Sequence, residues 1–150
     1  MDNNRFARSM MNMITRLHRQ KNRFMQERMR QFGLTGPMYQ FMISLHTHPG
    51  CSQDYLVENY GMDKGNVARA AKKMEAMGLI RRKVSLDDRR QYQLYLTEKG
   101  LAIMPHVKRA LDDWAAQLCK DMTPAQRESA EEILQMMTDN IYPRENENGV

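Results

Sequence analysis

Four histidines and two cysteines are the side chains of this chain that could bind a transition metal or act as nucleophiles. His46, His48 and Cys51 lie close together in the sequence, and zinc accepts ligands of these types. A zinc site would need a second group of ligands, such as two histidines four residues apart on a helix. No histidine stands four residues from His106 in the long helix expected after Thr97. We therefore expect histidines of loops and helix ends, with no metal and no other cofactor.

Catalytic chemistry has no recognisable motif in this sequence. Neither a Ser/His/Asp arrangement nor a pair of carboxylates at a catalytic spacing stands out, and the acidic pairs at 112–113 and 131–132 are typical of solvated helix faces. Two cysteines are too few for a disulfide framework. A redox role for Cys51 or Cys119 stays open, because Cys51 precedes an expected helix start whose dipole could lower the pKa of its thiol. We expect a protein that is not an enzyme.

The basic residues are concentrated in the first two thirds of the chain. The net charge of the chain is +5. Residues 1–62 carry 8 basic and 4 acidic side chains, residues 63–100 carry 10 basic and 5 acidic ones, and residues 101–150 carry 5 basic and 9 acidic ones. The excess is greatest from Lys64 to Arg90, with 9 basic side chains against 3 acidic ones. A patch of this kind predicts a polyanionic partner, of which nucleic acid is the commonest.

Composition and length indicate a water-soluble globular protein. The 150 residues are 41% hydrophobic and 27% charged. No apolar stretch approaches the roughly 18 residues of a membrane span, and arginines interrupt the N-terminus where a signal peptide would be apolar. We expect a cytoplasmic protein without membrane contact.

Apolar residues recur at helical spacing over most of the chain, and this pattern predicts four long helices outside the central segment. The first runs from about Asn4 to Gln31, and Thr35 is expected to cap a second that ends at His48. Thr97 is expected to cap a third, to about Lys120, whose apolar stripe is Leu101, Met104, Val107, Leu111, Trp114 and Leu118. Thr123 and Gln126 form the capping box of the last one. Polar residues 143–150 predict a frayed tail.

The central segment has the pattern of a helix-turn-helix. Ser52 and Asp63 are expected to cap two short helices, to about Asn59 and Met77, joined by a turn at 60–62. On a helical plot the second helix has an apolar face of Val67, Ala70, Ala71, Met74 and Met77. Its other face carries small and basic residues, namely Gly65, Asn66, Arg69, Lys72, Lys73 and Ala76. Such a face suits the major groove of DNA, because small residues allow close approach while Arg and Asn reach base edges.

Two strands are expected directly after this helix. Residues 79–84 and 91–96 have strand patterns, and the charged loop 85–90 between them ends in Arg89 and Arg90. A helix-turn-helix followed by a hairpin is the winged-helix arrangement, and arginines at the hairpin tip could enter a minor groove. The predicted fold class is therefore mainly α with a small β-hairpin.

Residues 66–100 resemble the signature of the multiple-antibiotic-resistance regulator (MarR) family. The matching positions are Asn66, Arg69, Met74-Glu75, Gly78-Leu79-Ile80, Asp88-Arg89-Arg90 and Thr97-x-x-Gly100. The resemblance implies one MarR-type domain over residues 1–150. It would have a winged helix-turn-helix lobe at 35–97 and a helical dimerisation lobe at 1–34 and 98–142, whose apolar stripes would pair in a homodimer.

The resemblance also implies roles for individual residues on a palindromic DNA operator. Asn66, Arg69, Lys72 and Lys73 would lie in or near the major groove, and Arg89 and Arg90 would lie at the wing tip. Asp88 would hold the wing. Ser52, Lys64 and Gly65 are candidates for phosphate contacts through a hydroxyl, an ammonium and a backbone N–H.

Regulation by a small aromatic or phenolic ligand is implied in the same way. The ligand would lie in a crevice whose expected lining is His18, Tyr39, Phe41, Met42 and Met104. The 15 methionines would suit an adaptable pocket, although Met-rich stripes more often fill a core. The predicted function is a transcriptional repressor that such a ligand releases from DNA. The alternatives are a redox-responsive regulator and a ligand-binding dimer that does not recognise an operator.

Overall fold

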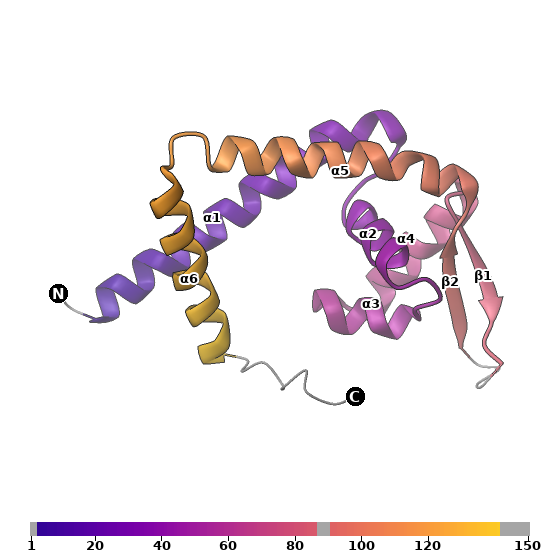
Figure 1. Cartoon of the computed structure of the whole chain (residues 1–150). Helices are drawn as coiled ribbons and strands as arrows, with labels where there is room; N and C mark the ends of the chain where they lie inside the picture. Colours follow the sequence, from indigo (N-terminus) through magenta and orange to yellow (C-terminus); the bar gives the residue numbers. More distant parts are fainter. Residues whose placement is uncertain (1–2, 87–90, 142–150) are drawn as a thin grey trace, which may run out of the picture. The chain divides into compact units, whose positions relative to one another are not determined.

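The computed structural model describes residues 3–86 and 91–141. These residues form mainly helices and one hairpin, which confirms the expected fold class (Figure 1). In chain order the elements are α1 (Asn3–Met29), a 3₁₀ turn (Arg30–Phe32), α2 (Met38–Thr47), α3 (Gln53–Tyr60), α4 (Lys64–Ala76), β1 (Ile80–Val84), β2 (Tyr92–Leu96), α5 (Glu98–Leu118) and α6 (Pro124–Ile141). The chain divides into two compact units, residues 1–114 and residues 115–150.

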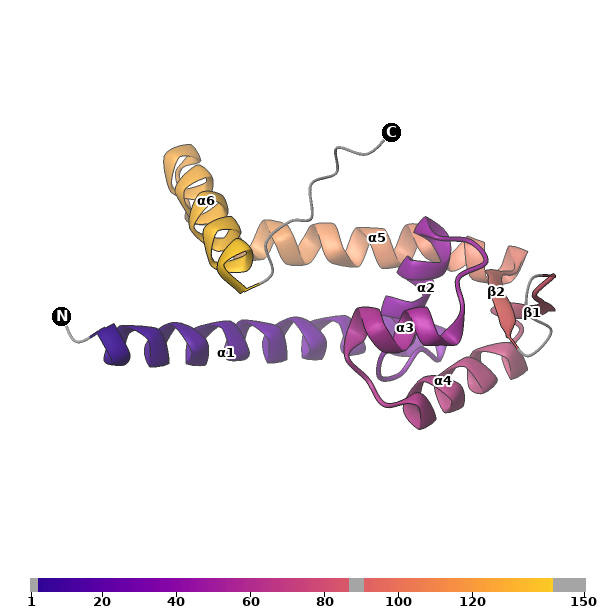
Figure 2. The same ribbon diagram turned by 90° about the horizontal axis from the view of Figure 1, so that it is seen from below.

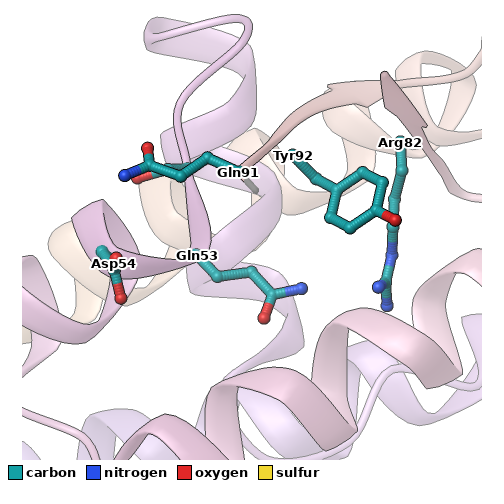
Figure 3. A pocket seen from close by; sticks show the side chains of 6 residues that line it. Gln53, Asp54, Arg82, Gln91 and Tyr92 are labelled. Atoms are coloured by element: carbon teal, nitrogen blue, oxygen red, sulfur yellow. The ribbon is translucent and has the colours of Figure 1, made fainter. Parts of the chain in front are cut away.

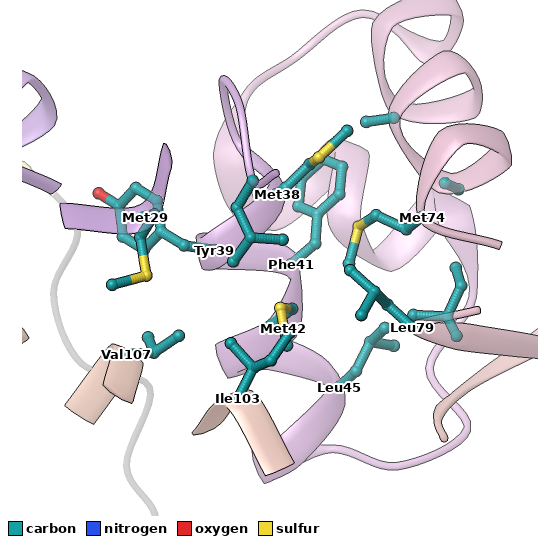
Figure 4. Close-up of a cluster of buried hydrophobic side chains, with 14 of the residues drawn as sticks. Met29, Met38, Tyr39, Phe41, Met42, Leu45, Met74, Leu79, Ile103 and Val107 are labelled. Carbon is teal, nitrogen blue, oxygen red and sulfur yellow. The ribbon is translucent and has the colours of Figure 1, made fainter. Parts of the chain in front are cut away.

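The hydrophobic core of the first unit lies among α2, α3, α4 and the hairpin, with contributions from the end of α1 and from α5. Five methionines are almost fully buried in it, which confirms that methionine here fills a core. These methionines are Met25, Met29, Met38, Met42 and Met74. Figure 4 labels four of them, Met29, Met38, Met42 and Met74.

The hairpin is antiparallel, and Ile80 pairs with Leu96 and Val84 with Tyr92. The other edge of β2 is also paired. The N–H of Gly50 donates to the carbonyl of Leu94 at 2.9 Å, and the N–H of Leu94 donates to the carbonyl of Cys51 at 3.0 Å. The loop before α3 therefore acts as a short third strand, which fixes the hairpin to the helix-turn-helix.

The second half of α1 lies against α5 within the first unit (Figure 2). The Phe24 and Trp114 rings are 5.5 Å apart between centroids, and the Phe32 and His106 rings are 4.8 Å apart. Beside them, Arg28 Nη1 lies 2.8 Å from Asp113 Oδ2. These contacts join the second half of α1, and the 3₁₀ turn after it, to the middle and second half of α5.

Local capping signals predicted most helix starts correctly. The Ser52 hydroxyl accepts the N–H of Tyr55 at 3.1 Å, the Asp63 carboxylate accepts the N–H of Asn66 at 2.9 Å, and the Thr97 hydroxyl accepts the N–H of Gly100 at 3.1 Å. The capping box of α6 is also confirmed, because Thr123 and Gln126 exchange both hydrogen bonds. The expected cap at Thr35 is wrong.

Thr35 instead begins a turn, in which the N–H of Met38 donates to its carbonyl at 3.3 Å. Helix α2 starts three residues after Thr35, with Pro37 at the N-cap position and no side-chain cap. The Thr35 hydroxyl accepts a hydrogen bond from Lys73 Nζ at 3.1 Å. The Thr35 hydroxyl, which the local sequence pattern assigned to capping α2, is therefore bonded to a residue that is distant in the sequence.

The expected stripe of α5 is only partly confirmed. Its buried residues are Gly100, Ile103, Val107 and Ala110, whereas Leu101 and Leu118 are each 47% exposed. The face that packs inside the chain is therefore rotated from the expected one, and the larger apolar residues lie beside it.

Large apolar side chains are exposed on two other helices. On α1 these are Phe6, Met11, Met13, Ile14 and Leu17, and on α6, within the second unit, they are Ile133, Leu134, Met136 and Ile141. Helix α6 has no buried residue at all among those described. Among the helices of residues 3–86 and 91–141, none combines the length and the apolar character that crossing a membrane requires.

Candidate nucleic-acid interface

Helix α4 separates its residues into a buried face and an exposed face, as its sequence predicted. Val67, Ala70, Ala71 and Met74 are buried against the core. Asn66, Arg69, Lys72 and Lys73 are all exposed. The buried side chains hold the helix against the unit, and the exposed face is free for a partner.

A chain of hydrogen bonds orders the first turns of the exposed face. The Asp63 carboxylate caps the helix and also accepts a hydrogen bond from the Asn66 side-chain amide. The Asn66 amide oxygen in turn accepts a hydrogen bond from Arg69 Nη2. This series of hydrogen bonds leaves most of the five guanidinium donors of Arg69 available. It also holds the Arg69 side chain in place before binding, so that less side-chain entropy is lost when a partner binds.

Gly65 provides the space for this arrangement. A Cβ atom at position 65 would lie 3.1 Å from Asp63 Oδ1 and 3.3 Å from Arg69 Nη1. The absence of a side chain therefore lets the Arg69 guanidinium lie back over the start of the helix. Gly65 is exposed, and its backbone is accessible at the end of the helix where the dipole favours anions.

Two of the three lysines expected at this surface, Lys64 and Lys73, have partners in the free protein. Lys64 Nζ lies 3.1 Å from Asp54 Oδ1, and these side chains are 78% and 51% exposed. An ion pair this exposed contributes about 0–1 kcal/mol, so an approaching phosphate can replace the carboxylate. Lys73 Nζ donates to Thr35 Oγ1 and therefore lies on the side of α4 that faces the turn before α2.

A polar cavity of about 290 Å³ separates the start of α3 from the hairpin (Figure 3). Ser52 lies at this cavity, as a phosphate-contacting hydroxyl would require, and its oxygen is also the cap of α3. The full lining is Ser52, Gln53, Asp54, Arg82, Gln91 and Tyr92.

Arg82 is a candidate that sequence reasoning did not single out among the basic residues of β1. Its Nε lies 3.0 Å from Glu75 Oε2 but forms no hydrogen bond, so the interaction with the end of α4 is an ion pair. Its guanidinium also lies 5.8 Å from the centre of the Tyr92 ring. Strand alternation could have separated it from Arg81, because the two side chains point to opposite faces of the hairpin.

Arg81 lies on the other face of the hairpin, with its guanidinium 4.7 Å from the centre of the Tyr95 ring. Arg81 and Tyr95 are also cross-strand partners. The expected wing residues Asp88, Arg89 and Arg90 lie outside the described residues.

A second cavity, of about 330 Å³, includes two of the five residues expected to contact a ligand. His18 and Tyr39 line it, together with Asn22, Gln26, Gly36, Pro37, Gln40, Tyr60 and Met62. Phe41 and Met42 do not, because both are at most 1% exposed within the core. Met104 packs against the same core and is not part of the lining either.

The polar groups of this cavity are connected by hydrogen bonds. The Tyr39 hydroxyl donates to Asn22 Oδ1 at 3.3 Å, and Asn22 Nδ2 lies 3.0 Å from His18 Nε2. Burial raises the pKa of Tyr39, with a smaller contribution from Tyr60, so Tyr39 stays a neutral hydrogen-bond donor near pH 7. The cavity thus offers aromatic side chains together with the Tyr39 hydroxyl and the Asn22 amide as polar groups.

The metal and redox chemistry considered from the sequence gains no support. Among the described residues no cluster of three His, Cys, Asp or Glu side chains could hold a metal ion. His48 instead contacts Thr47 Oγ1 at 2.9 Å and the Tyr55 hydroxyl at 3.3 Å. Burial raises the pKa of Cys51, which is opposite to the expected effect of the helix start, because the surrounding core disfavours the thiolate.

Comparisons with known proteins agree with this arrangement. The MarR family model matches residues 34–92. The transcriptional regulator YybA of Bacillus subtilis is 27% identical over 108 residues, which are 72% of this chain and 72% of YybA.

Two solved structures extend the similarity to most of the chain. A MarR transcriptional regulator from Methanosarcina mazei Go1 matches with a TM-score of 0.83 and 27% identity, over 89% of this chain and 96% of the other. A MarR family regulator from Listeria monocytogenes, solved in complex with a 26mer DNA, matches with a TM-score of 0.79 and 23% identity, over 87% of each chain. With the helix-turn-helix, the hairpin and the matching motif all in place, this chain is similar over most of its length to the winged-helix transcriptional regulators of the MarR family.

Proposed function

We propose that this protein is a homodimeric transcriptional repressor that binds a palindromic double-stranded DNA operator through α4 and the hairpin. The observation that carries the proposal is the exposed face of α4, where Asp63, Asn66 and Arg69 form an ordered polar chain above a buried apolar face. Arg and Asn are side chains that can bond two atoms of guanine and adenine, respectively, in the major groove. The DNA-bound Listeria relative shows that another protein of this fold binds duplex DNA.

The basic residues around α4 supply the contacts that do not depend on sequence. Lys64, the backbone at Gly65, Ser52 and Lys72 are the proposed phosphate contacts, and Arg82 joins them from the neighbouring cavity. Arg89 and Arg90 are proposed for the minor groove next to the major-groove site, with Asp88 holding the wing. Phosphate contacts position the protein, and contacts to bases provide the specificity.

Homodimer formation is supported by the apolar side chains left exposed on α1 and α6. An 18-residue helix with no buried residue has little reason to be stable unless another surface covers it. We propose that residues 1–34 and 98–142 form the dimerisation lobe and residues 35–97 the DNA-binding lobe. The two copies of α4 would then contact half-sites about 10 base pairs apart.

Ligand control is the remaining part of the proposal. The cavity at His18, Asn22 and Tyr39 has the size and the mixed lining expected for a small aromatic or phenolic ligand. Tyr60 and Met62 belong to its lining and stand just before Asp63, the cap of α4. A ligand that moves this turn would disturb the DNA-binding helix directly.

Footprinting on the DNA fragment beside the protein's own gene, with titrations at several salt concentrations, tests the proposal. A repressor of this kind protects two half-sites, and its affinity falls steeply as salt rises, because bound lysines and arginines release counterions from DNA. Absence of any salt-sensitive binding would favour a ligand-binding dimer that does not recognise an operator. Loss of binding on mild oxidation, prevented in a Cys51→Ser or Cys119→Ser variant, would favour redox control.

A further inference from the structure

Residues at the start of α5 bond the backbone carbonyls of the segment that links α4 to β1. The last carbonyls of α4 itself accept hydrogen bonds from the N–H groups of residues 77–79, which end the helix. The carbonyls of these three linking residues are in turn all bonded by Thr97 and Lys99. Lys99 Nζ donates to Met77 O at 2.7 Å, the Thr97 hydroxyl donates to Gly78 O at 2.6 Å, and the Thr97 N–H donates to Leu79 O at 3.0 Å.

Thr97 serves both helices with one side chain. Its hydroxyl oxygen accepts the N–H of Gly100 and thereby caps α5, while its hydrogen is donated to the carbonyl of Gly78. A hydroxyl has one donor hydrogen and two acceptor lone pairs, so both bonds are made at once. The direction of α5 at its first turn is therefore tied to the end of α4.

Gly100 makes this approach possible. A Cβ atom at position 100 would lie 2.3 Å from the carbonyl oxygen of Leu79 and 3.2 Å from Leu96 Cδ2. Ordinary C···O contacts begin near ~3.3 Å, so any side chain would push α5 about 1 Å away from Leu79. That shift would lengthen the 2.6 Å bond from Thr97 to Gly78 beyond hydrogen-bond range.

We infer that Thr97 and Gly100 are positioning residues that hold α4 in one direction relative to α5, so that Asn66 and Arg69 meet the DNA bases in register. The inference rests on the proposed function, in which α4 binds the operator. The buried face of α4 includes two alanines, Ala70 and Ala71, whose small side chains interlock little with their neighbours. The hydrogen bonds from Thr97 and Lys99 to residues 77–79, together with the close approach of Gly100 to Leu79, form a joint between α4 and α5. This joint is accordingly an important constraint on the direction of α4.

The Gly100→Ala variant tests this inference on the operator fragment found by footprinting. If the joint positions α4, affinity for the operator falls by about 5- to 150-fold for each base that α4 no longer reaches, while affinity for random-sequence DNA stays within about twofold. The affinity for random-sequence DNA is expected to change little because it depends on phosphate contacts. Phosphate contacts tolerate a small displacement of α4 that contacts to bases do not. An unfolded variant would bind neither DNA.

Ala102→Gly is the matched control, since Ala102 is exposed in the same turn region of α5 and lies outside the joint. Glycine stabilises a helix less than alanine does, so this variant lowers the stability of α5. It should nevertheless leave the operator affinity at the parent value. Thr97→Ser keeps the hydroxyl and should retain operator affinity, whereas Thr97→Val should lose it as Gly100→Ala does. These two variants keep the test decisive if Gly100→Ala does not fold.

Parent-like operator affinity in both Gly100→Ala and Thr97→Val would overturn the inference. Equal reductions in affinity for operator and random DNA in the folded variants would overturn it as well. Failure of the parent protein to bind the fragment would instead refute the proposed function, so the two failures are distinguishable.

Discussion

Replacing Arg69 by alanine removes the side chain best placed on α4 to recognise a base. In the free protein its guanidinium donates one hydrogen bond to Asn66, and the side chain is exposed. The substitution leaves the buried face of α4 and the Asp63 cap unchanged. Its effect on the melting temperature should therefore be small, because surface substitutions usually change stability by no more than about 0.5 kcal/mol.

The effect on the operator should be large. A bidentate contact from Arg to guanine is worth about 1–3 kcal/mol. Both subunits of a dimer lack it in the variant, so the total is about 2–6 kcal/mol, or a ~30-fold to ~10⁴-fold weaker affinity. Random DNA should be bound nearly as well as before, because a base contact is absent there in any case.

Salt dependence separates a base contact from a phosphate contact. Each phosphate neutralised adds about 0.9 to the slope of log affinity against log salt. Lys64→Ala should therefore reduce the slope of the dimer by about 1.8, whereas Arg69→Ala should leave it nearly unchanged. Fluorescence anisotropy titrations at four salt concentrations, on operator and scrambled DNA, measure both quantities.

Lys108→Ala is the control for charge alone, because it removes one exposed positive charge from α5. It should alter neither the affinity ratio nor the slope by a measurable amount. If Arg69→Ala binds the operator as the parent does, or if it lowers both affinities equally with a reduced slope, then α4 does not recognise bases through Arg69.

Four further outcomes follow from the same structure. Asp63→Ala should lower the free energy of unfolding by about 1 kcal/mol in urea titrations, because the cap of α4 is removed, and Asp63→Asn should restore most of it. Leu94→Ala should cost about 2–5 kcal/mol in the same assay, since Leu94 is fully buried; a smaller effect would mean that the core collapses around it. Since burial raises the pKa of Tyr39 from 10.0, the unfolded state loses its proton first as pH rises; stability should fall above about pH 10, and Tyr39→Phe should flatten that fall in thermal melts. Burial also raises the pKa of Cys51, so iodoacetamide should modify it at pH 7 more slowly in the folded Cys119→Ser protein than in the urea-unfolded one; a faster reaction would revive the redox role.

Local interactions explain what the sequence alone determined. The caps at Ser52, Asp63, Thr97 and Thr123 each join groups about three residues apart, so the residue types in the sequence were sufficient to place them. The two faces of α4 follow from helical periodicity in the same way. The match to the MarR signature depended on residue types at set spacings, and it indicated the fold and the class of partner together.

Only the tertiary structure decided which distant groups meet. Thr35 bonds Lys73 rather than capping α2, and Arg82 pairs with Glu75, because residues far apart in the sequence come together in the folded unit. Phe41 and Met42 fill the core while Asn22 and Tyr60 line the cavity, a difference that apolar spacing within one helix cannot reveal. Gly100 shows the same limit most clearly. The sequence shows that residue 100 is a glycine, but it does not show why. A Cβ atom at this position would lie 2.3 Å from the Leu79 carbonyl oxygen. This close approach exists only after α4 and α5 have packed together.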